Sequence, residues 1–213
     1  VGVRRHLLTP GEAGFEDGTL NYQSIAGVEV GLQHLAKVGM DAIGTRVRCL
    51  TGWLLEQLVG LRHSNGRPMV RIYGPLDTVM RGGIVTMNFY DPAGHLLNYR
   101  RIEELASEQQ ISFRTGCFCN PGAGETAEGI TAEDITAALS ERPDLTLQLF
   151  LQIVTARGGK SAGAIRVSFG LASNFADAER FLQFAETLRD QTRLGVGEAT
   201  FDIEAGRVLR DGS

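Results

Sequence analysis

Lysine is scarce in this sequence of 213 residues, where it occurs only as Lys37 and Lys160. The formal net charge is -4, and no run of lysine or arginine stands out along the chain. A protein that binds nucleic acid needs a concentrated positive field to attract the phosphate backbone. The sequence therefore argues against nucleic acid as a partner.

Long hydrophobic runs are also missing. The longest, at residues 84–87 and 145–154, fall well short of the roughly 20 apolar residues that a membrane-spanning helix needs. No secretory signal pattern opens the chain. We therefore expect no membrane span and a cytoplasmic location.

Cysteine occurs three times, as Cys49, Cys117 and Cys119. So small and odd a number cannot build a disulfide framework, which favours reduced thiols. A zinc site is not predicted either, because neither Cys49 nor any of the four histidines offers a second ligand pair at supporting spacing. The cysteines are therefore to be judged by the reactivity of their thiols.

Helices and short strands are predicted to alternate along the chain. Apolar residues recur at helical spacing in residues 21–38, 41–65, 100–110 and 174–188, and the first of these helices is expected to bury one face. Strands are expected at residues 69–73, 84–90, 111–114 and 164–169. Thr131 with Asp134 indicates a further capped helix start, residues 145–154 fit helix or strand, and residues 204–207 suggest a small hairpin. The alternation indicates an α/β packing of a sheet covered by helices.

One loop places two thiols beside a guanidinium. It follows the strand that is predicted to end at Arg114, contains Cys117 and Cys119, and is bounded by glycine and proline. Loops held by rigid strands often carry reactive groups, and a nearby arginine cation favours the nucleophilic thiolate. Arg114 could also bind a substrate carboxylate through two parallel hydrogen bonds. On spacing alone, two packed loop cysteines without function remain an alternative.

The loop at residues 114–123, Arg-Thr-Gly-Cys-Phe-Cys-Asn-Pro-Gly-Ala, resembles the cysteine loop of the molybdenum cofactor sulfurases. These belong with the cysteine desulfurases to the class V aminotransferases. Three further stretches resemble this family in the same order, at residues 15–21, 70–73 and 163–170. The resemblance extends over about residues 15–184 and is weakest at residues 125–160. Gly124 departs from it, because the family often has cysteine there.

The resemblance implies the C-terminal part of a pyridoxal phosphate (PLP) dependent transferase of fold type I, with a small α+β domain of short strands covered by helices. Residues 1–40 would form the end of the large PLP domain and its connecting helix. Residues 41–191 would form the small domain with the cysteine loop, and residues 192–213 a tail or linker.

The resemblance also implies a role for each cysteine of the loop. Cys119 stands where the family's cysteine attacks the sulfur of a PLP-bound substrate cysteine and becomes a persulfide. Cys117 and Asn120 would have secondary roles at most. The implied reaction converts L-cysteine to L-alanine and passes sulfur to an acceptor, such as the molybdenum cofactor or a carrier protein.

The binding residues are implied in the same way. Arg114 and Arg166 correspond to the arginines that bind the substrate carboxylate, although Arg166 taken alone would be an outward residue of a strand. Gly18 and Thr19 resemble the turn that reaches the PLP phosphate of a partner subunit, which implies a homodimer. Without the resemblance, this pair is simply a turn before a helix.

Neither lysine suits the Schiff base that PLP chemistry requires. Lys37 is expected on a solvated helix face, and Lys160 lies in a glycine-rich segment. The resemblance places the required lysine upstream of Val1, so we expect a fragment that holds the substrate-binding and sulfur-accepting half. Two other functions stay open: a class V aminotransferase or lyase without desulfurase activity, and a sulfur-relay module that works without PLP.

Overall fold

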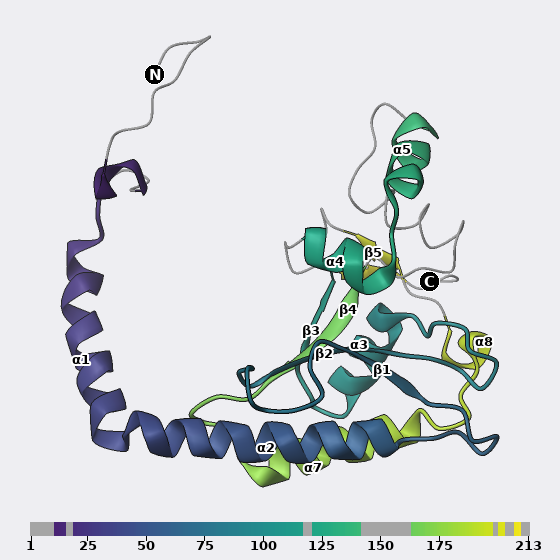
Figure 1. The fold of residues 1–213 in the computed structure, drawn as a ribbon, viewed down its shortest axis with the longest axis horizontal. Coiled ribbons are helices and arrows are strands. Elements are labelled where there is room, and N and C mark those ends of the chain that lie inside the picture. Colours follow the sequence, from purple (N-terminus) through teal and green to yellow (C-terminus); the bar gives the residue numbers. More distant parts are fainter. Residues whose placement is uncertain are drawn as a thin grey trace. The chain divides into compact units, whose positions relative to one another are not determined.

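The structure, a computed structural model, describes residues 11–15, 19–116, 121–141, 163–197, 200–202 and 207–209. It divides into two compact units, Val1–Gly44 and Thr45–Ser213. Its elements are labelled in Figure 1. In chain order they are the 3₁₀ helix η1 (Glu12–Phe15), α1 (Tyr22–Val38), α2 (Met40–Gly60), β1 (Val70–Tyr73), β2 (Ile84–Phe89), α3 (Tyr99–Glu108), β3 (Arg114–Gly116), α4 (Pro121–Glu128), α5 (Ala132–Glu141), β4 (Ala164–Ser168), α7 (Phe175–Thr187), α8 (Arg193–Val196), β5 (Thr200–Asp202) and β6 (Arg207–Leu209).

The first unit consists mainly of α1. The Asn21 side chain caps the helix by accepting a hydrogen bond from the Ser24 N–H at 3.1 Å, and Gly39 ends it with a φ of 89°. The predicted helix is therefore confirmed. The predicted buried face is wrong for the described residues, because no residue of α1 is buried and Ile25 and Leu32 are 52% and 61% exposed. Helical spacing identifies an apolar stripe but not the element that covers it.

The second unit is built on a four-stranded antiparallel sheet with the strand order β1-β2-β4-β3. Side chains in a strand alternate between its two faces. One face of this sheet is apolar, and Val85, Met87, Phe89 and Ile165 are each at most 1% exposed on it. Figure 1 shows α2 and α7 below the sheet and α4 above it.

The hydrophobic core lies on the apolar side of the sheet. At the margin of the core, Trp53 of α2 and the exposed Phe175 of α7 meet edge to face, with ring centroids 4.7 Å apart. Each buried large side chain contributes roughly 1.5–3 kcal/mol to stability. Helices α2, α3 and α7 supply much of this core through the residues Leu54, Leu55, Leu58, Ile102, Ala106, Phe181, Phe184 and Ala185.

Most predicted elements of this unit are found, with shifted ends. Asn174 caps α7 in a reciprocal capping box with Asp177, and Thr131 pairs with Asp134 in the same way before α5. The hairpin β5-β6 lies where a small hairpin was predicted. β3 begins at Arg114, where the predicted strand was expected to end. Residues 145–154 lie outside the described residues.

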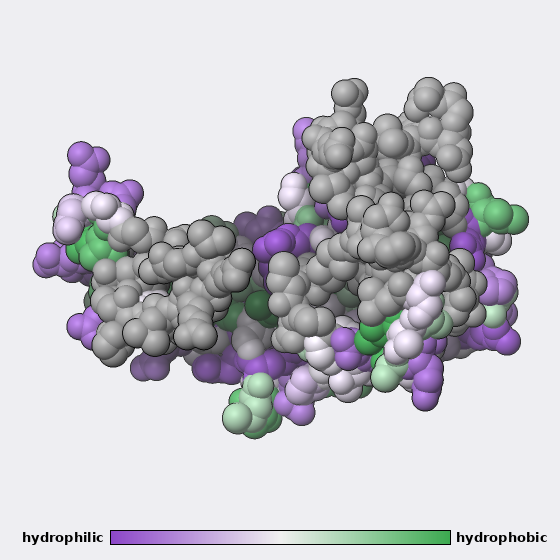
Figure 2. Space-filling model, turned by 90° about the horizontal axis from the view of Figure 1, so that it is seen from above, coloured by the Kyte–Doolittle hydropathy of each residue, from purple (hydrophilic) through white to green (hydrophobic). Residues whose placement is uncertain are grey.

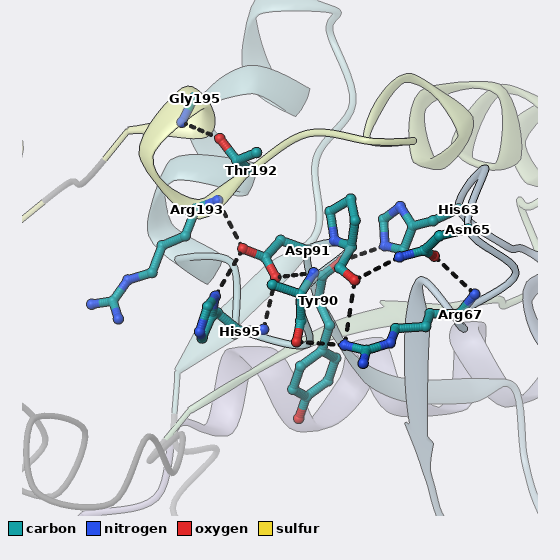
Figure 3. A network of polar contacts seen from close by, with 11 residues as sticks. His63, Asn65, Arg67, Tyr90, Asp91, His95, Thr192, Arg193 and Gly195 are labelled. Atoms are coloured by element: carbon teal, nitrogen blue, oxygen red, sulfur yellow. Dashed lines mark hydrogen bonds and ion pairs between the residues drawn. The ribbon is translucent and has the colours of Figure 1, made fainter.

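A network of polar contacts joins the segments that follow α2 and β2 with the start of α8 (Figure 3). A further contact of His63 reaches the end of α7. His63 is buried, its Nε2 lies 2.9 Å from the Tyr90 carbonyl oxygen, and its Nδ1 lies 3.0 Å from the backbone N–H of Asp190. Nδ1 thus faces the N–H and the carboxylate of Asp190, and Nε2 faces the carbonyl oxygen. His63 therefore ties together the segments that follow α2, β2 and α7.

Asp91 is the carboxylate of the same network. Its Oδ1 accepts hydrogen bonds from the backbone N–H groups of Ala93 and His95 at 2.9 and 2.8 Å, and its Oδ2 accepts one from Arg193 at 3.3 Å. Burial alone would raise the pKa of Asp91, but the hydrogen bonds from His95 and Arg193 outweigh burial and lower it. The turn at residues 91–94 is thus stabilised by its own first side chain.

Among the described residues, no helix combines the length and apolar character needed to cross a membrane.

Candidate functional site

The second face of the sheet is polar and brings the two predicted arginines together. In the strand register, Tyr73 pairs with Thr86, Thr86 with Arg166, and Arg166 with Arg114. Directly opposed residues share one face of a sheet, and their Cβ atoms lie about 4.5–5.5 Å apart. The four side chains therefore form a row across all four strands, with both arginines at the β4-β3 end.

This pairing suits the recognition of an anion. A carboxylate bound by two guanidinium groups accepts charge-assisted hydrogen bonds from both. Arg114 is exposed and Arg166 is half-buried, so the row is accessible at this end. A substrate carboxylate is the type of group that the pair can bind.

The described residues that are visible from above are mixed in polarity. Figure 2 looks down on the molecule from the top of Figure 1, and its coloured residues show hydrophobic groups separated by hydrophilic ones. Ile84 of β2 and Ser168 of β4 pair on the same face, two residues from the Thr86–Arg166 pair, and both are exposed. The described surface near Arg166 therefore offers a hydroxyl beside a large apolar side chain.

Contacts from α3 fix the position of β3. The Thr115 hydroxyl donates to Glu103 Oε2 at 2.6 Å, and Arg100 Nη1 donates to Thr115 Oγ1 at 3.2 Å. Thr115 thus points toward α3, and the alternation of the strand turns its neighbour Arg114 to the polar face. The strand ends at Gly116, whose φ of 114° is readily adopted only by glycine.

The predicted nucleophile follows immediately. Cys117, Cys119 and Asn120 fall within residues 117–120, which lie outside the described residues. The described chain resumes at Pro121, the first residue of α4. Proline is favoured at this position of a helix because its missing N–H would have no helical partner.

The residues predicted to serve the cofactor are not assembled by the described chain. Gly18 lies outside the described residues, and Thr19 is exposed in the first unit just before the cap of α1. Lys37 is the one lysine of the described residues, and it is exposed on α1, whereas Lys160 falls outside them. The described residues therefore fit the carboxylate of a substrate but not the covalent anchoring of PLP.

A polar cluster beside the arginine row was not predicted from the sequence. Asn88 is fully buried, and its Nδ2 lies 2.9 Å from Glu128 Oε1 of α4. Burial raises the pKa of the Tyr73 hydroxyl, and its hydrogen bonds with Glu128 and Tyr90 raise it further. Polar residues at alternate positions, Thr86 and Asn88 in an otherwise apolar strand, were the signal that could have revealed this face.

A metal centre has no support from the described part of the chain. No group of three or more His, Cys, Asp or Glu side chains gathers there in a way that could bind a metal ion.

Known proteins are similar to this chain in sequence and in fold. The family model for class V aminotransferases matches residues 3–181. The chain is 33% identical over 173 residues to the molybdenum cofactor sulfurase of Solanum lycopersicum, which covers 81% of this chain and 20% of that protein. It is 31% identical over 175 residues to the molybdenum cofactor sulfurase of Bos taurus, covering 80% of this chain and 19% of that protein.

Among solved structures, the apo structure of the cysteine desulfurase from Thermococcus onnurineus is similar, with a TM-score of 0.51 and 21% sequence identity. The match covers 88% of this chain and 36% of that chain. The chain spans about a fifth of the length of the curated relatives named above. The predicted fold, that of a fold type I transferase with a small domain of short strands covered by helices, is confirmed, and the sheet of this domain is antiparallel. The chain belongs to the class V aminotransferase family.

Proposed function

We propose that this chain forms the substrate-binding and sulfur-accepting part of a PLP-dependent cysteine desulfurase. The observation that carries the proposal is the pairing of Arg114 with Arg166 on the polar face of the sheet. Arg114 lies on the strand that leads, within five residues, to Cys119. One arginine of the carboxylate clamp and the thiol thus come from one short stretch of chain.

The proposed reaction transfers one sulfur atom. The carboxylate of L-cysteine binds to Arg166 and Arg114, and the Cys119 thiolate attacks the substrate sulfur. A bond forms between the two sulfur atoms, the bond between the substrate sulfur and its Cβ breaks, and Cβ takes up a proton. L-Cysteine and the Cys119 thiol thereby become L-alanine and a Cys119 persulfide, with no external oxidant or reductant.

PLP, when bound in the full-length protein, would supply the electron sink that this bond cleavage requires. The part played by the described residues is narrower. Arg114, whose guanidinium is exposed, would favour the thiolate form of the nearby cysteine as well as the bound carboxylate. Arg166, half-buried in the centre of the sheet, would fix the orientation of the substrate.

The relatives support a sulfur acceptor as the second partner. Those that match at about a third identity are named molybdenum cofactor sulfurases, so the molybdenum cofactor or a carrier protein is the proposed acceptor. Gly18 and Thr19 are proposed to contact the cofactor phosphate of a partner subunit, which makes the proposed assembly a homodimer.

The test compares two single-cysteine variants of the full-length protein. Cys119→Ala should abolish formation of L-alanine and sulfide from L-cysteine while PLP stays bound, and Cys117→Ala should have a much smaller effect. Mass spectrometry of the loop peptide should find the persulfide on Cys119. Full formation of L-alanine and sulfide by Cys119→Ala would contradict the role of Cys119. Wild-type protein that forms neither product would favour an aminotransferase or lyase, and a persulfide that forms without PLP would favour a sulfur-relay module.

A further inference from the structure

We propose that Thr86 is a third substrate-binding residue, whose hydroxyl donates a hydrogen bond to the carboxylate bound by Arg166 and Arg114. This inference rests on the proposed function, in which the arginine pair binds a substrate carboxylate. It makes a neutral side chain of β2 a determinant of specificity for substrates that carry this group. All three residues belong to described strands of one sheet.

Thr86 lies beside the arginine pair on the polar face of the sheet. It pairs with Arg166 in the register between β2 and β4, and Arg166 pairs in turn with Arg114 of β3. The Cβ atoms of directly opposed residues lie about 4.5–5.5 Å apart, and their side chains leave the sheet on the same side. The register therefore places a hydroxyl immediately beside the Arg166 side chain.

The Thr86 hydroxyl is available to a ligand. Thr86 is half-buried, and its hydroxyl forms no hydrogen bond with any other residue that the structure describes. Some polar side-chain atoms in the described part of the chain are enclosed without a partner, as Thr51 Oγ1 is, but the Thr86 hydroxyl is not one of them. It therefore faces solvent, and a ligand can replace water as its partner.

Two neighbouring polar side chains on this face are, by contrast, engaged within the domain. Asn88 Nδ2 lies 2.9 Å from Glu128 Oε1 and 3.1 Å from the carbonyl oxygen of Gly163. The Tyr73 hydroxyl forms a hydrogen bond with the same carboxylate. Of Tyr73, Thr86 and Asn88, only Thr86 therefore keeps its donor for a ligand.

A hydroxyl complements two guanidinium groups in the binding of a carboxylate. A carboxylate has about four lone-pair sites, so two arginines do not exhaust its capacity to accept hydrogen bonds. A threonine hydroxyl lies close to the backbone, whereas an arginine guanidinium lies at the end of a long side chain. In the proposed site, Thr86 donates from the floor formed by the sheet, and the arginines donate from the side.

The experiment measures how tightly the full-length protein with PLP binds L-alanine and ethylamine, by isothermal titration calorimetry. Ethylamine is L-alanine without the carboxylate, so the pair isolates the contribution of that group. Thr86→Val keeps the β-branched shape of the side chain and removes the hydroxyl donor. We expect Kd for L-alanine to rise about 10-fold and Kd for ethylamine to change less than about 2-fold, because only L-alanine offers a charged acceptor.

Thr86→Ser retains a hydroxyl and should keep Kd for L-alanine within about 3-fold of the wild-type value. Thr187→Val is the matched control, because Thr187 lies on α7 and its hydroxyl donates to the Phe184 carbonyl oxygen at 2.7 Å. This control should leave both affinities unchanged. In steady-state assays, Thr86→Val should raise KM for L-cysteine about 10-fold and change kcat less than about 2-fold, since the carboxylate itself does not react.

The outcomes separate this inference from the proposed function. Wild-type protein that binds L-alanine but forms none from L-cysteine contradicts the proposed reaction, whereas the calorimetry still decides the role of Thr86. An unchanged Kd for L-alanine in Thr86→Val overturns the inference. An equal loss of affinity for L-alanine and ethylamine overturns it as well, because it would indicate a distorted sheet, and so does a Thr86→Ser variant that binds as weakly as Thr86→Val. Wild-type protein with no affinity for L-alanine overturns both proposals.

Discussion

The Thr115 hydroxyl donates a hydrogen bond to Glu103 Oε2 at 2.6 Å and so ties β3 to α3. This contact joins the strand that carries Arg114 to a helix that buries Ile102 and Ala106 in the core. Because neighbouring side chains of a strand point to opposite faces, the contact on one face fixes the direction of Arg114 on the other. The position of a predicted substrate-binding residue thus depends on a hydrogen bond that involves no substrate.

A double-mutant cycle measures this contact in the 213-residue chain. Thr115→Val and Glu103→Ala should each lower the free energy of unfolding, and the cycle should give a coupling energy of about 1 kcal/mol, the net value of a typical hydrogen bond. Urea unfolding supplies the four values. The control cycle replaces Thr115→Val by Thr136→Val, whose hydroxyl donates to Ala132 within α5, and it should be additive. Additivity in both cycles would contradict the proposed link between α3 and β3.

The arginine pair should control the affinity for substrate. In the full-length protein, Arg166→Ala should raise KM for L-cysteine at least 10-fold, because a charge-assisted contact with the carboxylate is lost. Arg114→Ala should both raise KM and lower kcat, since Arg114 also lies near the thiol in sequence. Arg48→Ala is a suitable control, because Arg48 is an exposed arginine of α2 that donates to Thr45 on its own helix. Unchanged KM values in both variants of the pair would refute the carboxylate roles.

Asp91 should make the stability of the domain sensitive to acid. Its folded pKa is lowered below the ordinary value of 3.8, so its stabilising contribution is present above that value and is lost as the pH falls through the lower folded pKa. Asp91→Asn should therefore cost about 1.5–3 kcal/mol near neutral pH, the range for hydrogen bonds to charged groups. Urea unfolding between pH 3 and pH 7 checks this. The difference between wild type and variant should shrink below about pH 4, and a difference that stays constant to pH 3 would contradict the assignment.

The sequence predicted individual helices and their caps better than it predicted which other elements pack against them. Asn174 followed by an apolar helical stripe predicted α7 because capping and periodicity are encoded within a few residues. Helix α4 was missed because Pro121, Gly122 and Gly124 have low helical propensity. Contacts from Arg71 and Asn88, far away in the sequence, stabilise its last turn instead. Tertiary contacts of this kind override local propensity and leave no local signal.

In the candidate site, too, the sequence identified single residues but not the contacts between them. Arg114 and Arg166 could be named from the sequence, through their resemblance to family motifs, but their direct pairing could not be read from it. That pairing depends on the register between β3 and β4, two short strands separated by 47 residues of sequence from Gly116 to Ala164. The positions of Cys117, Cys119, Asn120 and Gly18 stay predictions, since these residues lie outside the described residues.

The last prediction concerns the 213-residue chain when it is expressed alone. We expect it to form no stable covalent link with PLP and to show no desulfurase activity, although its loop thiols should still react with alkylating reagents. Covalent binding needs a lysine beside the cofactor, made nucleophilic at neutral pH by burial or by a neighbouring cation. Lys37 is exposed on α1, in a different compact unit from the arginine pair.

An absorption spectrum with PLP, followed by borohydride reduction and peptide mapping, identifies any labelled lysine. Lys37→Arg is the control for non-specific labelling, because it removes an exposed lysine while it keeps the charge. Any weak labelling in wild type should disappear in this variant and should accompany no formation of L-alanine. Stoichiometric labelling of Lys160 together with activity toward L-cysteine would contradict the prediction, since it would mean that this chain carries its own cofactor-binding lysine.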